Sequence, residues 1–498
     1  MRFLVLRCLF RCRNVSEAVT CRQMSMARPQ NSVNPSTIYP RLDSVDLSDD
    51  TSKCDSGLKE FNFKNYRDAY QYKTTWEIIR ALTILRMCSV NYLVDNSLSM
   101  MKRVQRASGV RGLRIFLKPT LYNQFVGGES TKEIRACVRR LAETGMRAML
   151  AATMEEDVGE GGDENVYNNN CERILESIEI VTEEDTPSPM IQLKLSGLLS
   201  ADLLVALGDI YTTMPDKVRL ISSLSQELTG HSLHEPQLDV LGDEKKKALS
   251  KALERFKKIC LAAQRKAVKV LVDAEYTYLN PGMSALTLAA VAVFNRDSPI
   301  IWNTYQCYLK NARCKVEEEM KIILEDFGCH FGAKVVRGAY MVQEMNRAEK
   351  FQIESPVCES YAATSETYDY VISFLLNKNS QLGLKCQFII ASHNEESIKL
   401  AVKRMTELKI DRQAGGVCFG QLYGMCDYIS NPLANAGYAV YKSIPFGTID
   451  EVLPYIARRA IENKSVIEGG RKELSLLKSE LSRRTLGIFK CKASHSRS

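Results

Sequence analysis

Residues 386–408 read CQFIIASHNEESIKLAVKRMTEL, and this stretch shows the pattern that decides the fold. The short apolar run 386–393 is typical of a buried strand, and the amphipathic segment 394–408 after it is typical of a helix. Helices are also expected at 365–376 and 450–463. Seven other apolar runs repeat the strand pattern: 146–152, 190–198, 267–275, 299–306, 333–340, 416–421 and 438–444.

This alternation of strands and helices predicts a parallel sheet whose strands are joined by crossover helices. Eight such units over about 320 residues favour a (β/α)8 barrel over an open doubly wound sheet, which usually has fewer strands. We therefore expect an α/β fold with a barrel domain at 146–465, which carries a helical insertion at 200–262.

The segments that flank the barrel have a different character. Apolar residues at helical spacing predict helices at 75–102 and 131–144, the second capped by Ser130 or Thr131, in an N-terminal helical region at 61–145. Residues 31–60 are rich in Ser, Asp, Asn and Pro and indicate a disordered linker. A C-terminal helix with a basic tail is expected at 466–498.

The net charge of the chain is concentrated at its N-terminus. The formal charge is +8, and residues 1–30 contribute +5 of it through six arginines and one glutamate. An arginine-rich, acid-poor start predicts a mitochondrial transit peptide at 1–30, and Arg7 interrupts the apolar run that a secretory signal would need. The rest of the chain is nearly balanced, so nucleic acid is not an expected partner, and no apolar run approaches the length of a membrane span.

Metal and dinucleotide motifs are not found. The sixteen cysteines include no C-x-x-C pair and are expected to be mostly buried, reduced thiols. His231 and His234 lie in a loop-like stretch without a recognisable third ligand, so no metal site is predicted. The glycine cluster at 159–162 is acidic and does not join a strand to a helix, as a dinucleotide fingerprint would.

Polar residues stand at or near the ends of seven of the eight predicted strands. Because the carboxyl ends of barrel strands meet at one mouth, and a charge there is costly unless solvated or paired, this set predicts a site. Its members are Lys194, Asp273, Glu275, Gln306, Arg337, Tyr340, His393, Asn394, Gln421 and Ser443.

The helix after the last strand adds cations to this mouth. Tyr455, Arg458, Arg459 and Glu462 share one helix face, which is either a solvated stripe with an Arg458–Glu462 pair or part of the site. With Lys194, the two arginines could fix a carboxylate or phosphate. The residues alone indicate a barrel enzyme with a small anionic substrate and reveal no cofactor.

The same segments carry a resemblance to a known family. They include VDAE (272–275), NTYQ (303–306), KVVRGAY (334–340), ASHNEES (391–397), CFGQLYGMCD (418–427), AGYAVYKSIPFG (436–447) and YIARRAIEN (455–463). In this order they resemble the proline dehydrogenase family, flavoenzymes that oxidise a pyrrolidine ring inside a distorted (β/α)8, TIM-like barrel.

The resemblance implies noncovalently bound FAD and ubiquinone as the electron acceptor, with peripheral contact to the matrix side of the inner mitochondrial membrane. The residues implied to line the flavin are Gln306, Lys334, Arg337, Gly338, Ala339, Tyr340, His393, Asn394 and Gln421. Lys194, Arg458 and Arg459 are implied to clamp the substrate carboxylate, and Asp273, Leu422 and Tyr455 to shape the pocket. Bacterial members carry arginine at the position of Lys334, so a fork-shaped donor is replaced here by a single ammonium.

Ser443 is informative about substrate preference. Proline-specific members of the family usually carry a tyrosine at this position, and its ring packs near C4 of the substrate ring. A serine leaves space and a hydrogen-bond partner for a 4-hydroxyl group. With Tyr276, this favours the hydroxyproline dehydrogenase branch and trans-4-hydroxy-L-proline as substrate. Three alternatives stay open: a strict L-proline dehydrogenase, a flavin-free hydrolase or lyase using Asp273 and Glu275, and a non-catalytic binding protein.

Overall fold

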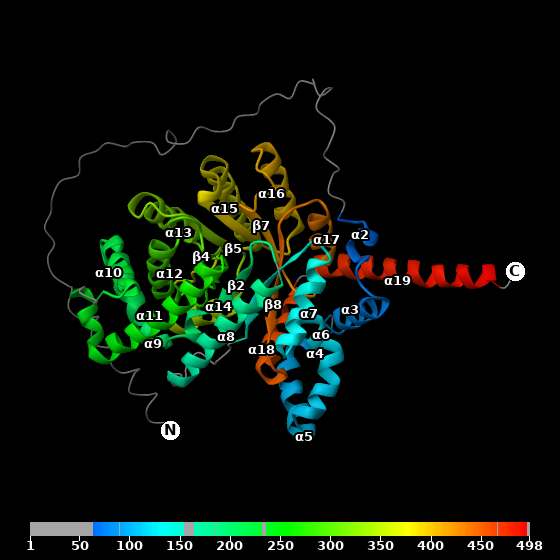
Figure 1. Cartoon of the computed structure of the whole chain (residues 1–498). Helices are drawn as coiled ribbons and strands as arrows, with labels where there is room; N and C mark the ends of the chain where they lie inside the picture. The colour runs from blue at the N-terminus through cyan, green and yellow to red at the C-terminus, as the bar shows by residue number, and fades with distance from the viewer. Residues whose placement is uncertain are drawn as a thin grey trace, which may run out of the picture. The chain divides into compact units, whose positions relative to one another are not determined.

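Eight parallel strands close into a barrel in the computed structural model, and their spatial order follows the chain from β1 to β8. Helices surround these strands (Figure 1). The barrel closes because β8 pairs with β1 over six residue pairs, from Arg147 opposite Tyr441 to Ala152 opposite Phe446. The predicted α/β barrel is confirmed. The strands are β1 (Arg147–Ala152), β2 (Met190–Leu193), β3 (Lys269–Val272), β4 (Ile301–Gln306), β5 (Phe331–Val336), β6 (Cys386–Ala391), β7 (Val417–Leu422) and β8 (Val440–Phe446).

The structure describes residues 63–88, 90–153, 164–184, 186–231, 236–465 and 467–495. The predicted transit peptide, the predicted linker, the glycine cluster at 159–162 and His234 lie outside this set.

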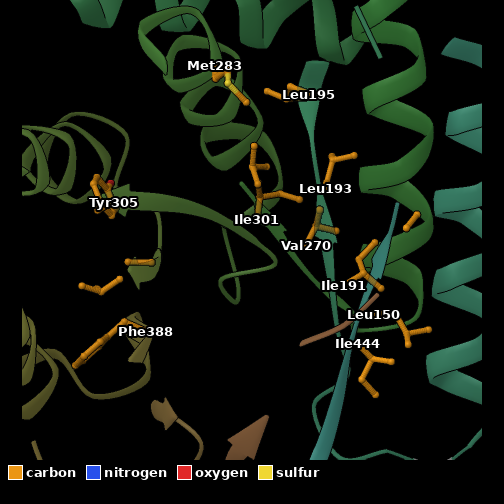
Figure 2. Close-up of a cluster of buried hydrophobic side chains, with 14 of the residues drawn as sticks. Leu150, Ile191, Leu193, Leu195, Val270, Met283, Ile301, Tyr305, Phe388 and Ile444 are labelled. Carbon is orange, nitrogen blue, oxygen red and sulfur yellow. The ribbon is translucent and has the colours of Figure 1, made fainter. Parts of the chain in front are cut away.

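The two faces of the barrel strands bury different sets of side chains, because successive residues of a strand point to opposite sides. Outward side chains such as Leu150, Ile191 and Val270 join the large core between the strands and the helices (Figure 2). Inward side chains form a second cluster that fills the barrel below its mouth. It contains Met149, Met190, Leu271, Trp302, Ile389, Cys418, Ala439 and Tyr441.

Helices cover the outside of the barrel between successive strands. The strand ends of β6 and β8 lead directly into α16 (Glu395–Glu407) and α18 (Ile449–Ser465). The other covering helices are α8 (Glu164–Glu183), α12 (Asn280–Phe294), α13 (Ala312–Lys321), α14 (Met341–Phe351), α15 (Tyr361–Leu382) and α17 (Asp427–Asn435).

The segment 200–262 contains three helices between β2 and β3, namely α9 (Ala201–Thr213), α10 (Lys217–Thr229) and α11 (Gly242–Arg265). Helices α9 and α10 pack against α12. Gly208 and Gly282 permit the close crossing of α9 and α12, because a Cβ on Gly282 would lie 2.1 Å from the Leu204 carbonyl oxygen.

The N-terminal region is helical, but the helix predicted at 75–102 is interrupted. It divides into α3 (Thr75–Cys88), α4 (Asn91–Asp95) and the first part of α5 (Ser97–Leu117), because the backbone leaves helical geometry at Val90 (φ −95°, ψ 106°) and Asn96. The short helices α2 (Tyr66–Tyr70) and α6 (Asn123–Phe125) lie on either side of this segment in the chain. The helix predicted at 131–144 is α7 (Thr131–Ala142), with Ser130 as its cap.

Helix α19 (Ile467–His495) packs against α2 and α3 and ties the two ends of the described chain together. Arg484 donates hydrogen bonds to the backbone carbonyls of Tyr70 (3.0 Å) and Lys73 (2.7 Å). Within the described residues, no helix combines the length and the apolar character that crossing a bilayer requires.

A buried group of charges lies where α19 meets the barrel. Asp427 pairs with Lys73 and Lys442 at 2.8 Å each, and Glu473 of α19 accepts the Cys426 backbone N–H at 3.3 Å. Burial raises the pKa of Glu473 to about 7, and the nearby Asp427 carboxylate adds to the rise.

This raised pKa predicts a pH-dependent contribution to stability. Between pH 4.5 and 7 the unfolded chain has lost the Glu473 proton that the folded chain retains, so stability falls as pH rises through this window and is level above it. Glu473→Gln keeps an acceptor without the charge. We expect it to raise the free energy of unfolding by roughly 3 kcal/mol at pH 8, with the difference closing near pH 4.5.

Thermal unfolding midpoints at pH 4.5 and pH 8 measure this effect. Glu480→Gln on the same helix is the matched control, because ion pairs with Arg483 and Arg484 lower the pKa of Glu480 despite its burial. The control variant should therefore lose stability at pH 8. Equal midpoints for wild type and Glu473→Gln at pH 8 would contradict the prediction.

Candidate active site

A cavity of about 430 Å³ lies at the carboxyl ends of the strands, above the inward cluster. Fifteen of the seventeen residues proposed from the sequence line it, from seven of the eight strand ends and from α18. They are Lys194, Asp273, Gln306, Lys334, Arg337, Gly338, Ala339, Tyr340, His393, Gln421, Leu422, Ser443, Tyr455, Arg458 and Arg459.

A chain of hydrogen bonds crosses the cavity floor. Lys334 of β5 donates to Asp273 at 2.7 Å and to the side-chain oxygen of Gln192 at 2.9 Å. The Gln192 amide nitrogen donates to the Ser443 hydroxyl at 2.6 Å. Lys334 is only 8% exposed, so these partners compensate the burial of its charge.

His393 is held as a neutral ring at the end of β6. Burial, with the nearby cations Lys442 and Arg459, lowers the pKa of His393 to about 3. The Leu422 backbone N–H donates to Nε2 at 3.1 Å, so the ring proton must be on Nδ1. His393 therefore offers a neutral N–H donor at physiological pH and is not a proton-accepting base.

Two glutamines of the cavity wall hold loops with their amide groups. The Gln306 amide nitrogen donates to the carbonyls of Ala274 (3.3 Å) and Glu275 (3.1 Å). Gln421 points outward like Phe419, donates to the Ser392 carbonyl at 3.3 Å and accepts from Ser430 at 3.0 Å. Both residues shape the wall, and these amide groups bond to the protein itself.

Asn394, like Glu275, is a sequence-predicted site residue that does not line the cavity. Its side chain caps α16 by accepting the Ser397 N–H at 3.0 Å and donates to the Tyr361 hydroxyl at 2.9 Å. Helix capping therefore accounts for a polar residue at this strand end. Arg337, in contrast, stands at the rim, where its guanidinium lies over the rings of Tyr361 and Tyr368.

Asp273 and Glu275 stand two positions apart near one strand end, but the structure does not bring both into the cavity. Strand β3 ends at Val272, so the alternation of faces does not continue to Glu275. Asp273 lines the cavity, whereas Glu275 is 3% exposed, accepts from Ser196 at 2.7 Å and is not part of the lining. Burial raises its pKa. The pair does not flank one substrate, which removes the basis for an acid–base hydrolase or lyase.

Three cations converge on the cavity from the two sides of β1, because β2 and β8 both pair with that strand. Lys194 follows β2, and Arg458 and Arg459 come from the third turn of α18, beside Tyr455. Arg459 is 7% exposed, and its guanidinium lies over the Tyr455 ring at 4.8 Å. Arg458 and Arg459 thus face the site rather than forming only a solvated stripe. The Glu462 side chain lies outside the described residues.

Gln192 is a polar residue of the cavity lining that was not predicted from the sequence. It lies in MIQLKL (190–195), two residues before Lys194 and therefore on the same inward face of β2. A single amide inside an otherwise apolar strand is the signal that could have found it.

The family model described as proline dehydrogenase matches residues 134–471, which contain the whole barrel and its cavity. The chain belongs to the proline dehydrogenase family.

Curated relatives include a hydroxyproline dehydrogenase from Xenopus laevis, 40% identical over 418 residues, which are 83% of this chain and 88% of the relative. A protein named proline dehydrogenase 1, mitochondrial, from Dictyostelium discoideum is 32% identical, over 83% of this chain and 74% of the relative.

Among solved structures, proline utilization A from Bdellovibrio bacteriovorus, crystallised after inactivation by N-propargylglycine, has a similar fold. Its TM-score is 0.57 at 18% identity, and the match covers 83% of this chain but only 40% of that one. At this identity the similarity shows the fold alone, and it agrees with the barrel of this member of the proline dehydrogenase family.

Proposed function

We propose that this protein is an FAD-dependent dehydrogenase that oxidises trans-4-hydroxy-L-proline in preference to L-proline. The product is the corresponding Δ1-pyrroline-5-carboxylate, 3-hydroxylated when the substrate is hydroxyproline. One observation carries the proposal: a single cavity brings the three cations Lys194, Arg458 and Arg459 together with Ser443. Family membership and the relatives named hydroxyproline dehydrogenase support it.

The chemistry of the donor set fits FAD. The cavity combines the Lys334 ammonium, the Arg337 guanidinium and the His393 ring, which suit the carbonyl oxygens, ring nitrogens and phosphates of that cofactor. The backbone at Gly338 and Ala339 is exposed beside them, and Gly338 has φ +151°. A Cβ on Gly338 would lie 1.8 Å from the Tyr308 ring, so glycine is needed for this close approach.

FAD, when bound, would supply the acceptor of a hydride from the ring carbon next to the substrate nitrogen. The protein residues would then bind and orient the substrate, shape its pocket and stabilise a buried charge. Lys194, Arg458 and Arg459 bind the substrate carboxylate and orient the ring, while Tyr455 and Leu422 shape the pocket. Asp273 stabilises the Lys334 charge at 2.7 Å. The ring nitrogen must be neutral so that its lone pair can assist hydride departure.

Anaerobic reduction tests this function. The purified protein should be yellow, and its flavin absorbance should bleach when trans-4-hydroxy-L-proline is added, and less readily with L-proline. A protein that is colourless and gains no FAD on reconstitution would contradict the proposal, because a flavin-free enzyme has no such absorbance. Bleaching by L-proline alone would contradict the substrate preference.

We further propose that ubiquinone takes the electrons and that the protein works in mitochondria, on the matrix side of the inner membrane. The arginine-rich residues 1–30 and relatives named as mitochondrial support the compartment. A quinone dissolved in a bilayer requires peripheral contact of the protein with that bilayer.

Helix α5 supports such contact because it combines exposed apolar side chains with charged side chains that are all positive. Residues 96–128 contain six cations and no Asp or Glu. Val104, Val110, Ile115 and Phe116 are 39–72% exposed, and only Met101, Leu113 and Leu117 of α5 are buried. This combination is typical of a helix that lies at an anionic membrane surface.

The position of α5 connects this surface with the active site. Helix α5 packs against α18, the helix that carries Tyr455, Arg458 and Arg459, and both lie at the bottom of Figure 1. Gln105 donates to Asp450 of α18 at 2.7 Å. Membrane contact through α5 would therefore bring the cavity close to the bilayer.

Vesicle binding measures this contact. The triple variant Arg103→Glu, Arg106→Glu, Arg111→Glu should bind phosphatidylcholine–cardiolipin vesicles at least roughly 100-fold more weakly than wild type, since each cation near an anionic surface contributes about 1 kcal/mol. A matched triple reversal at Lys245, Lys403 and Arg265, which are exposed elsewhere, should bind nearly as wild type. Equal losses in the two triple variants would rule out α5 as the contact.

A further inference from the structure

The hydrogen bonds around Gln192 have a fixed direction. The Lys334 ammonium carries three donors and no acceptor, so the Gln192 oxygen must face it. The Gln192 amide nitrogen is then forced toward Ser443, 2.6 Å away, and the Ser443 oxygen must accept. The buried charge of Lys334 thus sets the orientation of an amide that would otherwise be free to turn over.

This direction decides what Ser443 can offer to a ligand. Because its oxygen already accepts from Gln192, its own O–H is left to donate, and Ser443 lines the cavity. Among the hydrogen bonds of the described residues, none is donated by the Ser443 hydroxyl. A ring hydroxyl of a bound substrate is a suitable acceptor, whereas a ring without that hydroxyl gains nothing.

We propose that Gln192 is a positioning residue for substrate selection: oriented by Lys334, it holds Ser443 as a hydrogen-bond donor toward the ring hydroxyl of the substrate. The inference rests on the proposed function and adds to it a residue on β2 that need not touch the substrate itself. Selection then depends on three residues from β2, β5 and β8, joined across the barrel.

Two substitutions of Gln192 distinguish its role in positioning Ser443 from a role in filling space. Gln192→Met keeps a side chain of similar length and removes both hydrogen bonds. Gln192→Glu keeps the shape and the contact with Lys334, but its carboxylate can only accept, so it takes the Ser443 proton away from the substrate. We expect both variants to lower the ratio of kcat/KM for hydroxyproline to that for proline about tenfold, as for the loss of one hydrogen bond.

L-Proline is the internal control, because general damage to the barrel lowers kcat/KM for both substrates and leaves their ratio unchanged. Gln387→Met is the matched protein control. Gln387 also accepts from a lysine, Lys269, at 2.8 Å, but it is not part of the cavity lining. This variant should keep the wild-type ratio.

A double-mutant cycle completes the test. In a Ser443→Ala background, Gln192→Met should change the ratio less than twofold, because the donor it positions is already gone. A wild-type ratio in Gln192→Met, or a further tenfold drop in the Ser443→Ala background, would overturn the inference while leaving the proposed function intact. Turnover of neither substrate by the wild type would overturn the proposed function and this inference with it.

Discussion

Replacing Arg459 by methionine should lower kcat/KM for hydroxyproline and for proline by on the order of 100-fold, mainly through a higher KM. Arg459 is 7% exposed and lines the cavity, so its hydrogen bonds to a carboxylate form in a largely desolvated site. A charge-assisted hydrogen bond contributes about 1.5–3 kcal/mol, which corresponds to this loss. Arg458→Met, at a more exposed position, should have a smaller effect in the same direction.

Steady-state kinetics with both substrates measure the effect, since losing a contact made equally in ground and transition states raises KM without changing kcat. Arg265→Met, at an exposed position in the last turn of α11, is the control and should leave both constants unchanged. The flavin content of each variant separates substrate binding from cofactor loss. Unchanged KM values in both Arg458→Met and Arg459→Met would remove these residues from the carboxylate clamp.

Ser443→Tyr should reverse the substrate preference, with the ratio of kcat/KM for hydroxyproline to that for proline falling roughly 100-fold. Two effects add. The phenol ring fills the space that a 4-hydroxyl group needs, and the hydroxyl that Gln192 holds at 2.6 Å is lost from that position. Activity on proline should persist, because a ring without a 4-hydroxyl can pack against tyrosine.

Ser443→Ala is the companion variant, because it removes the hydroxyl without adding volume. Its ratio should lie between those of wild type and Ser443→Tyr, which separates the hydrogen bond from the steric effect. Wild-type preference for proline, or a ratio unaffected by the tyrosine, would show that Ser443 is only a smaller residue in a proline-specific enzyme.

The strands of the barrel were predictable because the pattern is local. Each apolar run is short, is followed by a helical segment and recurs eight times, so both the number of strands and their parallel order follow from the sequence. The predicted ends of these runs agree less well with the ends of the strands in the structure. The run at 267–275 passes beyond β3, which ends at Val272, because the turn after a strand can continue its apolar and polar alternation.

The residues that line the cavity were predictable for a related reason. In a closed parallel barrel all carboxyl ends lie at one mouth, so a residue at a strand end is near the site without any knowledge of its partners. Lys194 was found in this way, and Arg459 was found because its helix follows the last strand, although 265 positions separate the two residues in the chain. Asn394 is an exception to this rule, because a polar residue at a strand end can also cap the next helix.

The sequence by itself therefore determined the eight-unit barrel, the mouth where the polar residues gather and the cations that gather there. Only the tertiary structure decided how those residues are paired and oriented. It joined Lys334 to Asp273 and Gln192, turned Glu275 away from the cavity and directed the Gln421 amide outward. The physical reason is that strand periodicity is a property of neighbouring residues, whereas a hydrogen bond across the barrel depends on the distance between segments far apart in the chain.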